Sequence, residues 1–230
     1  MTEVVLWDID GTLLNFIASE KAALFRCFEL FGLGQCTEEL HRHYSAVNVR
    51  YWEKLERGEM TKDQILTERF RSFFRETGLP ENLAEAFNRE YESRLADTVC
   101  FCEHAKETLT ALQGKVLQCA VTNGTRQVQE RKLHESGLDR LLDRIYISDV
   151  IGAQKPDPAF FTHVLNDLGN IPKERFLIVG DSLTGDILGG IRSGLPTCLY
   201  NPSGNPVRPD IRPDREIRDL LQVISLVLGT

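Results

Sequence analysis

The chain has 230 residues, of which 42% are hydrophobic and 27% are charged, a balance typical of a globular protein with one domain or one domain plus a modest insert. Its formal net charge of −7 argues against a nucleic-acid polymer as the partner, since such partners usually require a basic protein face. No apolar stretch is long enough to span a membrane and no export signal opens the chain, so we expect a cytoplasmic protein without a membrane partner.

Five short apolar segments, bounded by Gly, Asp, Asn or Pro, are predicted to be buried parallel β-strands. They are Val4–Trp7, Val116–Val121, Arg144–Ser148, Phe176–Val179 and Thr197–Tyr200. Helical patterns lie between and after the last four of them, near residues 126–136, 158–168, 184–193 and 215–229. Alternation of strands and helices indicates βαβ units, and therefore a parallel sheet with helices on both faces.

The first two predicted strands are too far apart in the sequence for one crossover connection. The residues between them are predicted to form helices near 16–32, 37–57, 61–77 and 81–96. The fold class is therefore α/β, a Rossmann-like parallel sheet core made by residues 1–15 and 97–230 with an inserted α-helical domain at 16–96. Four phenylalanines of the insert, Phe70, Phe73, Phe74 and Phe87, are expected to form its own core. His41 and His43, on a charged helix, are expected to be exposed.

Polar side chains follow four of the predicted strands. The groups are Asp8-Ile9-Asp10-Gly11-Thr12, then Thr122-Asn123-Gly124, then Lys155, and last Gly180-Asp181-Ser182 with Asp186 shortly after. Ligands of an open parallel sheet bind beyond the carboxyl ends of its strands. We therefore expect these four groups to meet at one edge of the sheet.

The chemistry of this edge points to a metal and a phosphate. Carboxylates as close as Asp8, Asp10 and Asp181 remain ionised together only with a cation among them, and an all-oxygen ligand set favours Mg²⁺. Thr122, Asn123 and the backbone N–H groups after Asp8 are suited to bind phosphate oxygens, and an ammonium can offset the charge. A carboxylate beside such a phosphoryl group can attack it, while a second carboxylate transfers protons.

These motifs and their order resemble the haloacid dehalogenase (HAD) superfamily of phosphohydrolases across essentially the whole chain. The resemblance is carried by D-x-D-G-T-L from Asp8, Thr122 in V-T-N-G, Lys155 in K-P-D-P, and G-D-S-x-x-x-D from Gly180. The inserted helices at 16–96 are similar to the C1-type cap of this superfamily, which closes over the leaving group and sets specificity.

The resemblance implies a role for each matched residue. Asp8 would be the nucleophile and a metal ligand, and Asp10 the general acid and base and a metal ligand through its carbonyl. Thr122, Asn123 and Lys155 would bind the phosphoryl group. Asp181 and Asp186 would complete the site for Mg²⁺, for which Mn²⁺ could substitute. The haloacid dehalogenases themselves lack the second aspartate of the first motif, so Asp10 favours phosphate ester hydrolysis.

The pattern Y-S-A-V-N-x-x-Y-W and the later D-I-L-G-G-I-x-x-G-x-x-T-C resemble the pyrimidine 5′-nucleotidase branch of this superfamily. That resemblance implies a small phosphorylated metabolite, a nucleoside 5′-monophosphate, as substrate. The residues expected near it are Asn15, Phe16, Asn48, Tyr51 and Trp52. Two alternatives stay open: a phosphatase for phosphoglycolate or a sugar phosphate, and a regulatory module that binds a nucleotide or phosphate without turnover. The sequence leaves the oligomeric state open.

Overall fold

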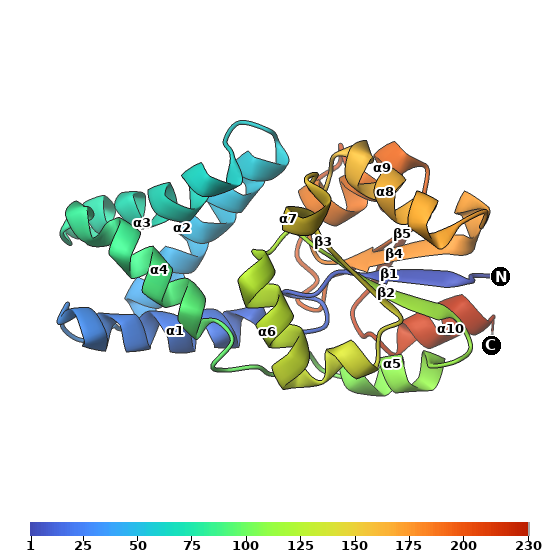
Figure 1. Ribbon diagram of the computed structural model, residues 1–230, viewed down its shortest axis with the longest axis horizontal. Coiled ribbons are helices and arrows are strands. Elements are labelled where there is room, and N and C mark those ends of the chain that lie inside the picture. Colours follow the sequence, from blue (N-terminus) through green and yellow to red (C-terminus); the bar gives the residue numbers. More distant parts are fainter. Residues whose placement is uncertain (230) are drawn as a thin grey trace. The chain divides into compact units, whose positions relative to one another are not determined.

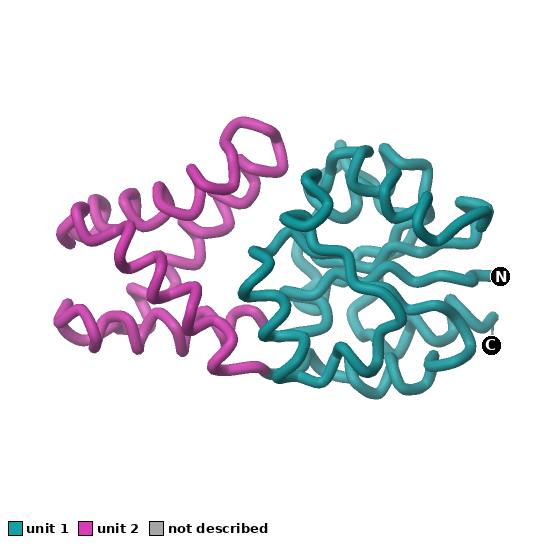
Figure 2. Tube along the Cα trace, viewed as in Figure 1, with its two compact units in different colours: residues 1–15, 100–230 teal, residues 16–99 magenta. Residues whose placement is uncertain are grey.

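The computed structural model describes residues 1–229, which form two compact units (Figure 2). The core unit contains Met1–Asn15 together with Cys100 and the residues after it, and the helical unit is Phe16–Val99. The sequence placed the second junction slightly earlier, at residue 96. Among the described residues, no helix is both long and apolar enough to cross a membrane.

A parallel sheet forms the centre of the core unit. In the described part of the chain its six strands are β1 (Val4–Trp7), β2 (Leu117–Thr122), β3 (Arg144–Ile147), β4 (Phe176–Gly180), β5 (Thr197–Tyr200) and β6 (Arg215–Ile217). Their spatial order is β3-β2-β1-β4-β5-β6, and neighbouring strands are parallel. Val4 is in register with Leu117 on one side and Phe176 on the other, so β1 is a central strand. Every residue of β1 is buried, as expected of a parallel strand covered on both faces.

Helices cover both faces of this sheet, which confirms the predicted architecture. They are α5 (Ala105–Leu112), α6 (Arg126–Ser136), α7 (Ser148–Ile151), α8 (Pro158–Leu168), α9 (Leu188–Ser193) and α10 (Gln222–Leu228). Figure 1 shows α8 and α9 on one face and α5 and α10 on the other. Phe160 and Phe161 of α8 pack in one buried cluster with Leu6, Cys119 and Ile178, alternate strand residues that share a face.

The prediction of one helix over 215–229 was wrong at its start. Arg215–Ile217 forms the edge strand β6, which pairs with Cys198–Tyr200 of β5. The helix begins only at Gln222, whose side-chain oxygen accepts hydrogen bonds from the backbone N–H groups of Arg218 and Asp219. This strand has only three residues, two charged and one apolar, which are too few to show a periodic pattern. Pairing with β5 therefore decides their conformation.

The helical unit contains four α-helices in the described residues: α1 (Phe16–Phe31), α2 (Glu38–Glu56), α3 (Lys62–Thr77) and α4 (Ala84–Arg94). A capping box between Thr61 and Gln64 begins α3, and Gly78 ends it in a left-handed conformation. The predicted aromatic core is confirmed, because the side chains are fully buried at Phe70, Phe73, Phe74 and Phe87.

The prediction that His41 is exposed was wrong. His41 is buried, and its Nε2 lies 3.3 Å from a carboxylate oxygen of Glu20. On α2, His41 shares one helix face with Tyr44 and Asn48, three and seven residues further on, and this face points into the interior of the helical unit. The charged neighbours of His41 occupy the other face, which is why composition alone misplaced it.

Candidate active site

The turn after β1 places Asp8 at the carboxyl edge of the sheet. The Asp8 N–H donates to the carbonyl of Val179 in β4 (2.9 Å), which ties the turn to the neighbouring strand. Gly11 has a φ of +100°, and a Cβ added there would lie 2.4 Å from Oδ2 of Asp181. Glycine is therefore required at position 11 both for the backbone conformation and for the approach of Asp181.

Three carboxylates from two neighbouring strands converge at this edge. Carboxylate oxygens of Asp8, Asp181 and Asp186 all lie within 4.8 Å of one another. Asp8 follows β1 and Asp181 follows β4, the adjacent strands between which the chain changes direction across the sheet, where ligands bind in open α/β folds. A Cβ added at Gly180 would lie 2.1 Å from Oδ2 of Asp186, so the glycine before Asp181 makes room for this cluster.

A π-helical turn, Leu183–Ile187, brings Asp186 back to the site. The carbonyl of Ser182 accepts from the N–H groups of both Asp186 and Ile187, and the Ser182 N–H donates to Asp186 Oδ2 (3.1 Å). The sequence predicted one helix over 184–193, whereas the regular helix α9 begins only at Leu188. Such wide turns are frequent at functional sites because they redirect a side chain.

Lys155 supplies the positive charge within the cluster. Its buried Nζ donates to Asp8 Oδ1 (2.7 Å), Asp186 Oδ1 (2.6 Å) and the carbonyl of Val121 (2.7 Å). The Asn123 side chain donates to the Lys155 carbonyl and accepts from the Lys155 N–H, both at 2.8 Å. Asn123 was expected among the phosphate-binding residues, but in this structure both polar atoms of its side chain hold the Lys155 backbone.

The site carries more buried negative charge than Lys155 can balance. Burial raises the pKa of Asp8 well above its usual range; Lys155 opposes this rise, while Asp186 and Asp181 add to it. Desolvation by the surrounding protein, followed by repulsion from Asp186, raises the pKa of Asp181 to about 7, although Asp181 is exposed and solvent therefore weakens this effect. Burial works against the charge on Lys155, but Asp186 and Asp8 outweigh it and raise the pKa of Lys155.

Asp10 points to a different set of partners. Its carboxylate accepts from Nε2 of Gln129 and from Nζ of Lys132, both at 2.6 Å and both on α6. Thr122, buried at the end of β2, accepts from the Gly124 N–H through its hydroxyl oxygen (3.1 Å). Sequence reasoning missed Gln129 and Lys132. Their three-residue spacing on the helix that follows V-T-N-G was the available signal.

The residues expected near a nucleoside have varied surroundings. Asn48 is buried, and its amide donates to Glu20 (2.8 Å) and accepts from Arg69 (2.9 Å), so its polar atoms are engaged inside the helical unit. Tyr51 and Trp52, on the same helix α2, are half-buried. The backbone N–H of Asn15 donates to the Cys100 carbonyl (2.8 Å) within the core unit, and the half-buried Phe16 begins α1 of the helical unit.

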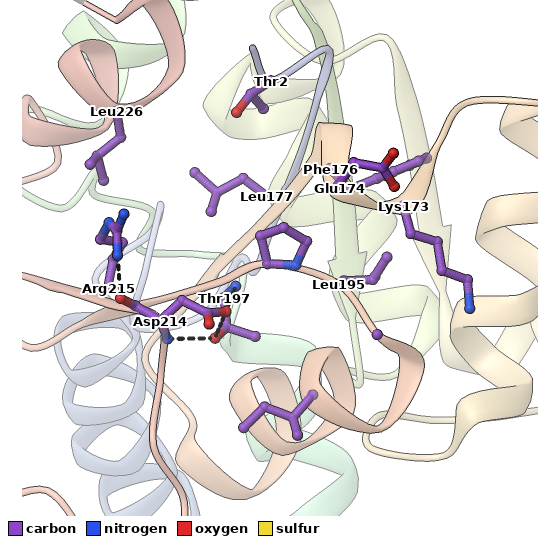
Figure 3. Close-up of a pocket in the computed structure, with 13 residues that line it drawn as sticks. Thr2, Lys173, Glu174, Phe176, Leu177, Leu195, Thr197, Asp214, Arg215 and Leu226 are labelled. Carbon is purple, nitrogen blue, oxygen red and sulfur yellow. Dashed lines mark hydrogen bonds between the residues drawn. The ribbon is translucent and has the colours of Figure 1, made fainter.

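A pocket of about 650 Å³ lies away from these carboxylates, at the amino ends of β4, β5 and β6 (Figure 3). None of the predicted site residues lines it. Two of its basic side chains are engaged with the backbone: Lys173 donates to the Ser193 carbonyl and Arg215 to the Asp214 carbonyl. The carboxylate cluster at the opposite edge, with its unbalanced charge, is therefore the better candidate for the active site.

Comparison with known proteins agrees with this geometry. The family model described as "Haloacid dehalogenase-like hydrolase" matches residues 5–200. Pyrimidine 5′-nucleotidase PynA of Streptococcus pneumoniae is 30% identical over 96% of this chain and 94% of its own length. Pyrimidine 5′-nucleotidase YjjG of Escherichia coli is 30% identical over 97% of this chain and 96% of its own.

Solved structures show the same fold. The HAD hydrolase YfnB of Bacillus subtilis, in a crystal structure described as bound to magnesium, superimposes with a TM-score of 0.91 and 32% identity and covers 98% of both chains. L-2-haloacid dehalogenase of Xanthobacter autotrophicus superimposes with a TM-score of 0.76 over 100% of both chains at 17% identity, which shows a shared fold alone.

Proposed function

The chain belongs to the haloacid dehalogenase-like hydrolase family, and from that membership and its active-site geometry we propose that it is a magnesium-dependent phosphomonoesterase that prefers pyrimidine nucleoside 5′-monophosphates. The phosphatase activity follows from its relatives. The observation that carries the proposed mechanism is the cluster of Asp8, Asp181 and Asp186, in which the Lys155 ammonium group pairs with Asp8 and Asp186.

The donor set of this cluster fits a hard divalent cation. Its ligand atoms are carboxylate oxygens, and the rise in the pKa values of Asp8 and Asp181 reflects negative charge that a cation would stabilise. We propose that Asp8, Asp181, Asp186 and the Asp10 carbonyl hold Mg²⁺, with Mn²⁺ as a substitute. Bound there, Mg²⁺ would neutralise the phosphate and orient it toward the nucleophile.

In the proposed reaction an oxygen of Asp8 attacks the phosphorus atom. The bond from phosphorus to the ester oxygen breaks, and an aspartyl-phosphate forms while Asp10 protonates the leaving oxygen. Asp10 then takes a proton from water, whose oxygen attacks the same phosphorus and releases inorganic phosphate and free Asp8. Thr122 and Lys155 would hold the phosphoryl oxygens during both steps.

The nucleotide preference is proposed from PynA and YjjG, which cover nearly the whole chain. Tyr51 and Trp52 are the better candidates for contact with the nucleoside, because both retain exposed surface. Asn48 would act only indirectly, through Glu20 and Arg69, since its amide is already engaged. Asn15 and Phe16, at the junction of the two units, remain candidates for substrate contact.

A panel of phosphate monoesters with Mg²⁺ tests this proposal. We expect kcat/KM for UMP, dUMP and dTMP to exceed that for purine nucleotides, sugar phosphates and phosphoglycolate by at least roughly tenfold, which corresponds to about 1.4 kcal/mol in the transition state. Asp8→Asn, purified in parallel, controls for contaminating phosphatases. Equal or lower values for the pyrimidine nucleotides would contradict the preference.

A second candidate substrate is phosphoglycolate. A phosphoglycolate phosphatase of Aquifex aeolicus is 29% identical over 85% of this chain and 83% of its own length. The same panel separates the two candidates, because a site built for a small phosphorylated carboxylic acid should reject a bulky nucleoside. The binding-module alternative predicts nucleotide binding without release of phosphate, and any turnover that Asp8→Asn abolishes would exclude it.

A further inference from the structure

We propose that Gln129 and Lys132 are positioning residues that orient the Asp10 carboxylate for proton transfer, and that residue 124 is glycine because Gln129 must pass over it to reach Asp10. This inference rests on the proposed role of Asp10 as general acid and base. It concerns three residues of α6 and the loop before it, none of which the four family motifs assigns to proton transfer.

Two donors from one helix face hold the two oxygens of Asp10. Gln129 Nε2 donates to Oδ2 and Lys132 Nζ donates to Oδ1, each at 2.6 Å. Residues three apart on an α-helix lie on the same face, so α6 presents both donors together. Because each carboxylate oxygen has its own donor, the plane of the carboxylate is set as well as its position.

Both donors are buried, whereas Asp10 is not. Gln129 and Lys132 are each only 1% exposed, and the Asp10 side chain retains 23% of its surface. Two buried donors therefore fix the Asp10 carboxylate, while its exposed surface stays accessible to small molecules. This is the arrangement needed for a group that must exchange protons with a substrate oxygen and with water.

The arrangement is poor for stability alone. In the described structure the side-chain oxygen of Gln129 is buried without a hydrogen-bond partner, a situation that costs about 1–3 kcal/mol. Burial of the Lys132 ammonium group carries a desolvation cost that can exceed what its ion pair with Asp10 returns. An apolar pair on this helix face would avoid both costs, so the two residues are better explained by their effect on Asp10.

Gly124 is explained by the same contact. Its φ lies outside the left-handed region, so its backbone does not demand glycine. A Cβ added at Gly124 would lie 2.1 Å from Nε2 and 2.7 Å from Cδ of Gln129. The glycine of V-T-N-G thus leaves room for the Gln129 amide, and links the loop after β2 to Asp10.

A positioning role makes a prediction that depends on the leaving group. The alkoxide released from an alkyl ester is strongly basic and needs a proton from Asp10, whereas 4-nitrophenolate leaves readily without one. A misplaced Asp10 should therefore lower kcat/KM for alkyl monoesters much more than for 4-nitrophenyl phosphate. A general loss of folding or of metal binding would lower both values alike.

The experiment compares Gln129→Ala and Lys132→Met with the wild-type full-length protein in Mg²⁺. The substrates are the best alkyl monoester of the panel and 4-nitrophenyl phosphate. We expect kcat/KM to fall roughly 10- to 100-fold for the alkyl ester, a part of the roughly 10²- to 10⁴-fold that general acid help is worth, and less than about threefold for the aryl ester. Lys132→Arg should restore part of the loss. In an Asp10→Asn background, Lys132→Met should add little, since the residue acts through Asp10.

Gly124→Ala tests the steric part of the proposal. We expect it to reproduce the leaving-group dependence of Gln129→Ala, and the double variant Gly124→Ala/Gln129→Ala to be no worse than Gln129→Ala alone. The same cycle, measured as free energy of unfolding, should also be non-additive, because the added methyl group harms the protein only when Gln129 is present. This second readout does not depend on turnover.

Equal losses on both esters in variants with normal thermal unfolding would overturn the positioning role, as would losses that are additive with Asp10→Asn. Additive effects of Gly124→Ala and Gln129→Ala would overturn the explanation of the glycine. If Lys132→Met does not fold, Gln129→Ala and Gly124→Ala still decide the question. If the wild-type enzyme prefers an alkyl ester other than a pyrimidine nucleotide, the substrate proposal fails, and that ester serves for this test.

Discussion

Each of the two units buries a group of charged side chains, and the groups differ in how their charges are balanced. In the helical unit, Glu20, Asn48, Arg69 and Asn88 form a chain of hydrogen bonds in which each side chain contacts the next at 2.8–2.9 Å. One buried carboxylate and one buried guanidinium are joined there through an amide. In the core unit, the buried Asp8 and Asp186 share the ammonium group of Lys155, and the exposed Asp181 adds a third carboxylate within 4.8 Å of them.

This difference in charge balance distinguishes a charged group that stabilises the fold from one that is suited to bind a ligand. A buried carboxylate and a buried guanidinium that balance each other's charge, as Glu20 and Arg69 do in the helical unit, need no charged ligand. In the core unit, desolvation and the neighbouring carboxylates raise the pKa values of Asp8 and Asp181, and a divalent cation bound among the carboxylates would balance their excess negative charge. Four experiments, three with single variants and one with pH, test this distinction between the two groups.

Asp8→Asn should have the largest effect on turnover. The amide keeps the shape of the side chain but is not a nucleophile, so we expect phosphatase activity to fall to background in a steady-state assay. The metal-free variant should unfold at a temperature no lower than the wild type, because one repelling carboxylate is gone. The control is Asp210→Asn, an exposed carboxylate of the core unit, which should leave activity unchanged. A kcat near the wild-type value would contradict the assignment of Asp8 as nucleophile.

Lys155→Met should affect both activity and stability. Removal of the ammonium leaves Asp8 and Asp186 facing each other in a buried site, and breaking such a pair costs about 3–5 kcal/mol near neutral pH. The loss should shrink in acid, where Asp8, whose pKa is raised by burial, accepts a proton. Chemical denaturation at two pH values measures it, and Lys115→Met, at an exposed lysine, provides the control. A stability loss that does not depend on pH would mean that Lys155 acts through packing and not through charge.

Arg69→Met should affect stability without affecting the chemistry. It leaves the amide oxygens of Asn48 and Asn88 buried without a donor, at roughly 1–3 kcal/mol for each. Below the unfolding temperature, we expect kcat on 4-nitrophenyl phosphate to change by less than about twofold. Arg71→Met, an exposed position on the same helix, should shift the unfolding free energy by less than about 0.5 kcal/mol. A large fall in kcat for folded Arg69→Met protein would show that the charged group of the helical unit also contributes to catalysis, and would contradict a purely structural role.

The smallest expected effect is the pH dependence of metal-free stability. Because burial and Asp186 raise the pKa of Asp181 to about 7 in the folded protein, the folded state binds more protons than the unfolded state between about pH 4 and pH 7. This group's contribution to stability is therefore present in acid and is lost as the pH rises through 7. Thermal unfolding in EDTA and in Mg²⁺, at about pH 5 and about pH 8, measures it.

We expect Mg²⁺ to raise the unfolding temperature more at the higher pH, where Asp181 holds less bound proton for the metal to displace. A concentration of 100 times Kd adds about 2.7 kcal/mol to stability. Asp181→Asn should flatten both dependences. Equal stabilisation by Mg²⁺ at the two pH values, or none, would contradict the assignment of the cluster as the metal site.

Local sequence determined most of the fold. All five predicted strands lie within one residue of their observed bounds, because short apolar runs ended by Asp, Asn or Gly are decided by their own residues. The order of the motifs likewise placed Asp8, Asp181, Asp186 and Lys155 at one edge, since parallel strands deliver their following loops to the same side.

Tertiary contacts decided the rest. Nothing within R-E-I specified the edge strand β6, which exists because β5 offers it a partner. His41 and Asn48 look like ordinary polar residues of a charged helix, and only the packing of α2 buries them. Gln129 and Lys132 contact Asp10, which lies more than a hundred residues earlier in the chain, and Gly124 leaves room for Gln129. Periodicity reports which face of an element is apolar, but a polar contact between distant segments depends on the folded positions of both, which no local pattern encodes.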